Sequence, residues 1–130
     1  MNRISSALVL SAGLALTTLP LAGCLAVAAA AGAGVGVAYV NGAVETTLDA
    51  NLERASKATE RALDDLKITL ISGQESGVDA HYKARTADDT SVTIKLQAET
   101  DKTSSISIRV GTFGDKNLSL QILDKIKSKL

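Results

Sequence analysis

Residues 78–110 read VDAHYKARTADDTSVTIKLQAETDKTSSISIRV and carry the most regular hydropathy pattern in the chain. Apolar and polar residues alternate along three runs, which is typical of β-strands with one buried and one exposed face. Polar segments around Asp88 and over 99–103 separate the runs, and such short connections join antiparallel neighbours. The three runs span 78–85, 92–98 and 105–110. They therefore predict two consecutive β-hairpins.

The segment before these hairpins predicts one more strand and a helix. Residues 68–70 begin a period-two run that ends in a glycine-bounded turn at 73–77. Further upstream, apolar residues recur every three or four positions over 49–66, which indicates an amphipathic helix. Asp49 is the candidate N-cap of this helix. A short strand over 43–48 is also compatible with the alternation there.

The end of the chain predicts a second amphipathic helix. Asp115 is its candidate N-cap, and apolar residues at helical spacing continue to Leu130. We expect both helices to cover one face of an antiparallel four-stranded meander, with 43–48 as an optional fifth short strand, because the apolar face needs cover. The predicted fold class is an α+β two-layer sandwich whose other sheet face stays polar and open to water.

Charge divides the chain into two parts that suit different solvents. Arg3 is the only charged residue before Glu45, and all other charges lie in the C-terminal part. A positive start followed by the apolar run 4–19 is typical of a bacterial secretion signal. The first part is therefore predicted to be a targeting or membrane segment, and the second a soluble domain.

A tetrapeptide at the end of this signal resembles the lipobox of bacterial lipoproteins. In that family the cysteine is linked to diacylglycerol, and the chain is cut just before it. The resemblance implies a signal peptide over 1–23 and lipidation of Cys24. The peptidase recognition residues would be Leu21, Ala22 and Gly23. Since Leu25 rather than Asp follows the cysteine, resemblance to Gram-negative lipoproteins favours the periplasmic side of the outer membrane over inner-membrane anchoring.

An apolar Ala/Gly-rich spacer over 24–42 connects the anchor to a predicted periplasmic domain over 43–130. Flexible tethers are usually polar, so this composition is unusual. Gly32 and Gly36 form a small-residue pair that can bring two helices together in lipid. Two interpretations are open: a spacer lying on the bilayer surface, or an element for self-association.

Composition argues against several classes of function. Fourteen basic residues balance fourteen acidic ones, and aromatic residues make up 2%, which disfavours a nucleic-acid partner. One cysteine and one histidine exclude thiolate clusters and histidine-rich zinc sites. No nucleophile–base or metal constellation is visible, so we expect no enzyme, no catalytic residues, no metal and no cofactor.

A few polar and aromatic residues are candidates for chemistry or binding. His81 is a conceivable general base, but a solvated surface histidine fits its polar neighbours better. Asp88 and Asp89 are ordinary turn residues, since hard cations need several converging oxygens. The segment 110–115 leads into a helix N-terminus, where Asp115 competes with any bound anion. Phe113 in that segment is expected to plug the edge of the core.

The open sheet face is the best candidate for binding. The pairing predicted around the turns brings four cations onto it, with Asp79 interleaved. The four are Lys83, Arg85, Lys95 and Arg109. Such a face favours an acidic envelope partner, and the alternative is a small ligand or an anionic lipid headgroup. A solvated face that discourages aggregation is the third interpretation.

Four further segments resemble a known family. They are Asn41-Gly42, 84–88 (ARTAD), 92–95 (VTIK) and 107–115 (SIRVGTFGD). These are similar to small bacterial lipoproteins catalogued as domain-of-unknown-function family thirty-five sixty-eight, over nearly the whole mature chain. The resemblance supports the envelope location and implies no activity or catalytic residues. The overall expectation is a lipid-anchored, non-catalytic interaction or structural module.

Overall fold

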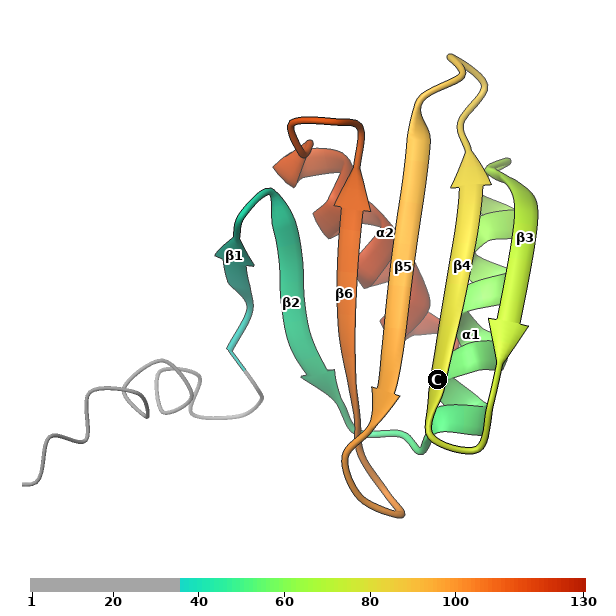
Figure 1. Ribbon diagram of the computed structural model, residues 1–130, viewed down its shortest axis with the longest axis vertical. Helices are drawn as coiled ribbons and strands as arrows, with labels where there is room; N and C mark the ends of the chain where they lie inside the picture. The colour runs from blue at the N-terminus through green and yellow to red at the C-terminus, as the bar shows by residue number, and fades with distance from the viewer. Residues whose placement is uncertain (1–35) are drawn as a thin grey trace, which may run out of the picture.

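The computed structural model describes residues 36–130, in which six strands form one sheet and two helices lie against the same face of it (Figure 1). The strands are β1 (Ala38–Val40), β2 (Ala43–Leu48), β3 (Thr69–Glu75), β4 (Asp79–Arg85), β5 (Ser91–Ala98) and β6 (Ser104–Val110). The helices are α1 (Leu52–Asp65) and α2 (Lys116–Ser128).

The sheet is antiparallel throughout, with strand order β1-β2-β6-β5-β4-β3. The predicted four-stranded meander with an optional fifth short strand is therefore wrong. Residues 43–48 form a full strand that pairs along its whole length with β6, from Ala43 opposite Arg109 to Leu48 opposite Ser104. Helix α1 then carries the chain to the other edge, where β3 begins.

Strand β1 was not predicted, and it lies at the end of the segment predicted as a spacer. It was missed because three residues, Ala-Tyr-Val, are too short a run to show a period. Its position depends on the turn at Asn41 and Gly42, whose φ angles of 50° and 83° are both positive. Asn-Gly with two positive φ angles closes the tight hairpins that match strand twist.

Helix α1 begins three residues later than the sequence pattern predicts. Asn51, rather than Asp49, is its N-cap: the Asn51 side chain accepts a hydrogen bond of 3.0 Å from the Arg54 backbone N–H. The delay has a local cause, because the Ala50 carbonyl accepts a 2.9 Å hydrogen bond from the buried Ser104 hydroxyl. That bond joins the start of α1 to β6 and leaves Asp49 exposed.

Helix α2 follows the prediction closely at its start. Asp115 is confirmed as its N-cap, since its side chain accepts a 3.0 Å hydrogen bond from the Leu118 N–H. At the other end, Lys129 forms an ion pair with Asp65 of α1, and this partner lowers the pKa of the Asp65 carboxyl. The two helices are thus joined at their C-terminal ends.

The core lies between the sheet and the helices. Alternate residues of β2, β4, β5 and β6 point into it, as do the apolar stripes of α1 and α2. Its largest fully buried members include Tyr82, Leu48, Leu63, Ile94, Leu96, Ile106, Ile108, Ile122, Leu123 and Ile126. The apolar side chains leave the opposite sheet face to polar residues, so that face is the broad surface on which a site can be built.

Two hydroxyls in this core, those of Tyr82 and Ser56, have no hydrogen-bond partner among the described residues. Burial raises the pKa of the Tyr82 phenol above its ordinary value of 10.0. The folded state therefore keeps this proton to a higher pH than the unfolded chain. The protonated phenol contributes its full stabilisation of the fold at pH values below the ordinary pKa. This contribution is lost as the pH rises through the raised pKa of the folded state.

Replacing Tyr82 with phenylalanine is expected to remove this pH dependence. Near neutral pH the effect is small, within about 1 kcal/mol, because the lost hydroxyl is unpaired. Urea unfolding at about pH 8 and about pH 11 measures the difference: Tyr82→Phe should lose less stability than the parent between the two. Equal losses would show that the phenol does not titrate differently in the folded and unfolded chains.

Candidate functional site

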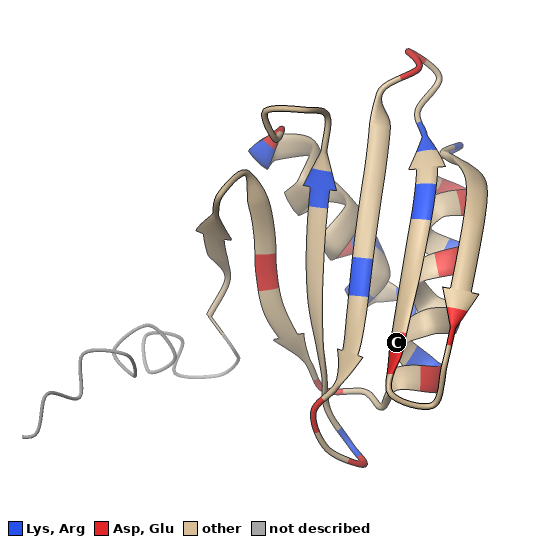
Figure 2. Ribbon diagram, in the orientation of Figure 1, with Lys and Arg blue, Asp and Glu red and all other residues tan. Residues whose placement is uncertain are grey.

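The open face of the sheet carries the four cations that the alternation pattern places there. They come from three neighbouring strands, β4, β5 and β6 (Figure 2). The strand register puts Lys83 opposite Thr93, and Thr93 opposite Arg109. Lys83 and Arg109 therefore belong to one row across the sheet. Lys95 stands in the next row, opposite both His81 and Ser107. The geometry therefore agrees with the prediction that these side chains share a face.

Two of the four cations are engaged within the protein. The Arg85 guanidinium donates to the Asp89 carboxylate at 2.8 Å, across the β4–β5 turn. Arg109 donates to two backbone carbonyls, that of Asn41 at 3.1 Å and that of Thr112 at 2.6 Å. Arg109 thus joins the β1–β2 turn to the loop after β6, which is a structural role that its place in the strand did not reveal.

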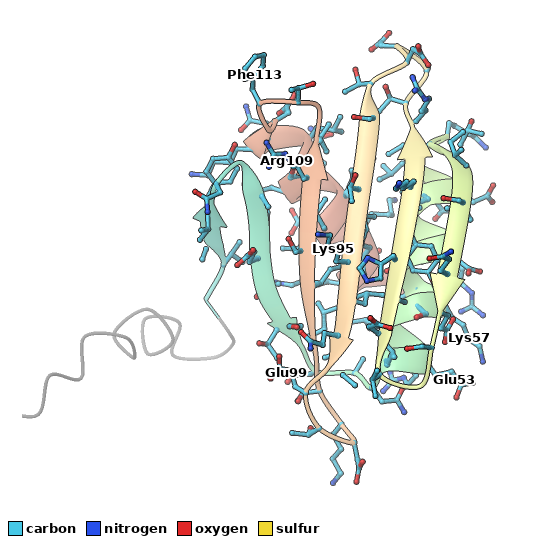
Figure 3. All side chains as sticks on the ribbon, in the orientation of Figure 1. Glu53, Lys57, Lys95, Glu99, Arg109 and Phe113 are labelled. Carbon is cyan, nitrogen blue, oxygen red and sulfur yellow. The ribbon has the colours of Figure 1, made fainter. Side chains whose placement is uncertain are left out.

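Lys83 and Lys95 are the cations of this face that remain available. Both side chains are exposed, and neither forms an ion pair or side-chain hydrogen bond with residues 36–130. They lie on adjacent strands in adjacent rows, which is the diagonal arrangement in which long side chains still reach a common group. Figure 3 shows Lys95 near the middle of the sheet, where the surrounding side chains are short or polar.

The face is less basic than the sequence suggests. Besides Asp79, it carries Glu45 of β2, which the register places opposite Ser107 and whose carboxylate accepts a 3.5 Å hydrogen bond from that hydroxyl. Glu45 was missed because only the pairing of β2 with β6 brings it onto this face. The Ser76 hydroxyl and His81 hold the pKa of Asp79 below its ordinary value. Lys95 therefore has one carboxylate in its own row, that of Glu45, and another in the next row, that of Asp79.

The remaining polar candidates have ordinary surroundings. His81 is about half exposed, and its Nε2 lies 3.5 Å from an Asp79 oxygen. Asp88 is exposed in the β4–β5 turn, and Asp89 pairs with Arg85. Within residues 36–130, no three His, Cys, Asp or Glu side chains gather as a metal site would require. The helix α2 N-terminus is occupied by the Asp115 carboxylate, which takes the place that an anion would need.

A surface groove of about 530 Å³ lies between the end of α1 and the edge strand β3. Its lining residues are Glu60, Leu63, Asp64, Lys67, Ile68, Thr69 and Leu70. Two carboxylates and one ammonium line it, so it has no strong preference for an anion. The groove adjoins the helix layer, whereas the two free lysines stand on the opposite face of the sheet.

Phe113 corrects another expectation. It was predicted to plug the edge of the core, but its side chain is 92% exposed. The loop that carries it, between β6 and α2, turns at Gly111 and Gly114, both with positive φ. These two turns point Phe113 away from the domain (Figure 3).

The predicted membrane anchor lies outside the described residues. This applies to the signal peptide over 1–23, to the recognition residues Leu21, Ala22 and Gly23, to the lipidation site Cys24, and to Gly32. Gly36 is described, and its carbonyl accepts a 3.2 Å hydrogen bond from the Thr46 hydroxyl. Neither helix in the described part has both the length and the apolarity needed to cross a membrane.

Comparison with known families agrees with the segments quoted above. The family model described as Protein of unknown function (DUF3568) matches residues 7–129, which is almost the entire chain. No curated protein matches the sequence. The match confirms the family resemblance, and this chain therefore belongs to the DUF3568 family of proteins of unknown function.

Proposed function

We propose that this protein is a lipid-anchored lipoprotein of the bacterial envelope whose folded domain is a non-catalytic interaction module. The anchor is supported by Arg3, the uncharged apolar run after it, and the Leu-Ala-Gly-Cys sequence that ends at Cys24. Leu25 supports sorting to the outer membrane, with the domain in the periplasm.

The open sheet face supports the interaction role. The helix-side face is filled by close-packed apolar residues, so the space between the layers serves stability. The other face presents Lys83 and Lys95 with unpaired ammonium groups among short hydroxyl side chains. Flat, polar surfaces with unpaired charge suit a protein partner that brings carboxylates to them.

A small anionic ligand is the second candidate, because the same two ammonium groups lie on adjacent strands and can approach one phosphate or headgroup. The flanking carboxylates of Glu45 and Asp79 argue against it, since they repel an anion of small size. A protein partner accommodates those carboxylates with its own cations. The charge pattern therefore favours a protein over a free anion.

A photo-crosslinking side chain at Thr93, between Lys83 and Arg109 in the sheet, tests the proposal in cells. We expect it to capture an envelope protein, and the double change Lys83→Glu and Lys95→Glu to weaken capture by about tenfold or more, because like charges then face each other across the interface. Arg61→Glu with Lys127→Glu makes the same change in net charge on the exposed helix layer and should leave capture intact.

Three results would count against an interaction module of this kind. If capture persists in the variant with Lys83→Glu and Lys95→Glu, the interface lies elsewhere on the protein. Equal losses in both double variants would show an effect of net charge alone. Absence of any protein adduct, together with loss of bound inorganic phosphate in the lysine variant, would support the small-anion alternative.

A further inference from the structure

A second surface lies at the edge of the sheet where β1, the β1–β2 turn and the β6–α2 loop meet. We call it the β1 corner and define it by Tyr39, Val40, Arg109, Phe113 and Lys116. Three of these are large apolar side chains exposed to solvent: Tyr39 at 41%, Val40 at 43% and Phe113 at 92%. Tyr39 lies on the helix side of this edge with Lys116, and Val40 lies on the open side with Arg109. Exposed apolar side chains next to cations on both sides of one edge mark an interaction site.

The loop that presents Phe113 is held from several sides. Arg109 donates to the carbonyl of Thr112, and the Tyr39 hydroxyl donates to the carbonyl of Gly114 at 3.3 Å. The backbone of Gly114 packs directly on that of Gly42. The approach is so close that a Cβ added at position 114 would lie only 2.6 Å from the Gly42 Cα. Phe113 is therefore fixed in an exposed position, and little ordering is required when it binds.

The corner is cationic as well as apolar. The Lys116 ammonium lies 5.7 Å from the centre of the Tyr39 ring, and the Arg109 guanidinium donates to the carbonyl of Thr112, the residue before Phe113. Figure 3 shows Arg109 and Phe113 at the same end of the sheet. Two carboxylates lie near the corner: Asp115 caps α2, and the exposed Glu45 stands opposite Ala38 at the far end of β1 from the Asn41–Gly42 turn. The exposed Asp88 belongs to the separate β4–β5 turn. Positive charge and apolar surface thus coincide on the β1 side.

Aromatic and aliphatic side chains rimmed by Lys and Arg are typical of surfaces that enter the headgroup region of an anionic bilayer. The chain also connects this corner to the proposed anchor, since Cys24 is followed by uncharged residues up to Val40, the last residue of β1. Ala38 lies fourteen positions after Cys24, which limits their distance to about 50 Å even when the chain between them is fully extended.

We propose that the β1 corner docks on the anionic membrane surface beside the lipid anchor and inserts Phe113 into it. This inference rests on the anchor proposed above. A second copy of the chain is a poorer occupant, because a symmetric pairing would bring the cations Arg109 and Lys116 against their own copies. With β1 at the membrane, the edge strand β3 stands about 24 Å away across five strand spacings. The open face then remains accessible to a periplasmic partner.

The chain contains no tryptophan, so Phe113→Trp introduces a single reporter at the corner. The processed, full-length lipoprotein is reconstituted in vesicles of phosphatidylglycerol and phosphatidylethanolamine with brominated acyl chains. We expect tryptophan emission from this variant to shift to the blue and to be quenched by bromine. The matched control is Val78→Trp, at a position 67% exposed in the β3–β4 turn at the opposite end of the sheet (Figure 1), which should be neither shifted nor quenched.

Adding Lys116→Glu to the reporter variant tests the charge. A glutamate at the first residue of α2 suits the helix N-terminus, so folding is maintained. We expect the equilibrium constant for membrane contact to fall by about fivefold or more, since each basic residue near an anionic surface contributes about that factor. High salt should have the same effect through screening.

The outcomes separate this inference from the anchor. A Phe113→Trp lipoprotein that floats with the vesicles but shows no quenching would overturn docking and leave the anchor intact. Equal quenching of the Phe113→Trp and Val78→Trp variants would overturn the choice of the β1 corner. A blue shift without quenching would mean that protein covers this position, against a membrane contact. A chain that fails to float would overturn both proposals.

Discussion

Replacing Cys24 with alanine is expected to abolish fractionation with the outer membrane and to leave the signal peptide uncut. The thiol is the attachment point in the proposed lipoprotein, and no other cysteine is present to substitute for it. Each buried CH₂ of an acyl chain contributes about 0.8 kcal/mol to membrane binding, so a diacyl anchor is far stronger than any contact of the folded domain alone. The expected change is therefore complete.

Intact mass and fractionation of parent and variant measure this directly. The parent should begin at Cys24 and carry the added mass of diacylglycerol, while Cys24→Ala should lack that mass. Ser11→Ala is the matched control, since it also places alanine in the N-terminal segment but leaves the lipobox unchanged. If the parent has an unmodified mass and still remains with the membrane, lipidation is refuted. Residues 4–40 would then have to be interpreted as a membrane segment.

Periodicity located both helices and the strands β4, β5 and β6, because side-chain burial imposes a period of two or about 3.6 on long elements. The turn predicted over 73–77 was placed too early, since β3 is exposed along its whole length and continues to Glu75. Periodicity also failed where pairing is decided by distant residues. β1 has three residues and owes its place to Asn41 and Gly42, and its pairing with β2 leaves no pattern in such a short run. The start of α1 depends on Ser104, which follows Ala50 by 54 positions in the sequence.

Part of the candidate site was predictable from the same alternation of buried and exposed side chains along the strands. Alternation places Lys83 and Lys95 on the open face whatever the strand order is, and within the described residues both are free there. Arg85 and Arg109 obey the same alternation, but turns at the strand ends supply them with partners that alternation cannot reveal. Phe113 was misassigned because hydrophobicity alone says that a residue can be buried, and only the loop geometry shows that it is not.

Replacing Gly114 with alanine is expected to destabilise the fold strongly, by about 2–5 kcal/mol, or to prevent folding. Two costs coincide at this position. Its φ of +83° lies in the left-handed region that side chains with a Cβ rarely adopt. The added Cβ would also overlap the Gly42 oxygen and lie 2.6 Å from the Gly42 Cα, both backbone atoms that cannot rotate away.

Two other glycines of the same domain separate these costs. Gly111 has a φ of +73°, but its Cβ would meet Thr90 at an ordinary 3.6 Å, so Gly111→Ala reports the conformational cost alone, about 1–2 kcal/mol. Gly77 has neither feature, since no atom lies within 4 Å of its Cβ, and Gly77→Ala should change stability by no more than about 0.5 kcal/mol. Urea unfolding of the three variants should therefore give losses in the order Gly114, Gly111, Gly77.

This order carries structural information beyond the loop itself. The close approach of Gly114 to Gly42 packs the β1–β2 turn against the β6–α2 loop, so the clash at Gly114 should loosen β1 together with Phe113. Hydrogen exchange of the amides in β1 is expected to rise in Gly114→Ala before that of β5, which lies inside the sheet. If Gly114→Ala and Gly111→Ala lost equal stability, the two backbones would have to be further apart than the fold places them. The β1 corner would then lack the rigid support on which its exposed phenylalanine depends.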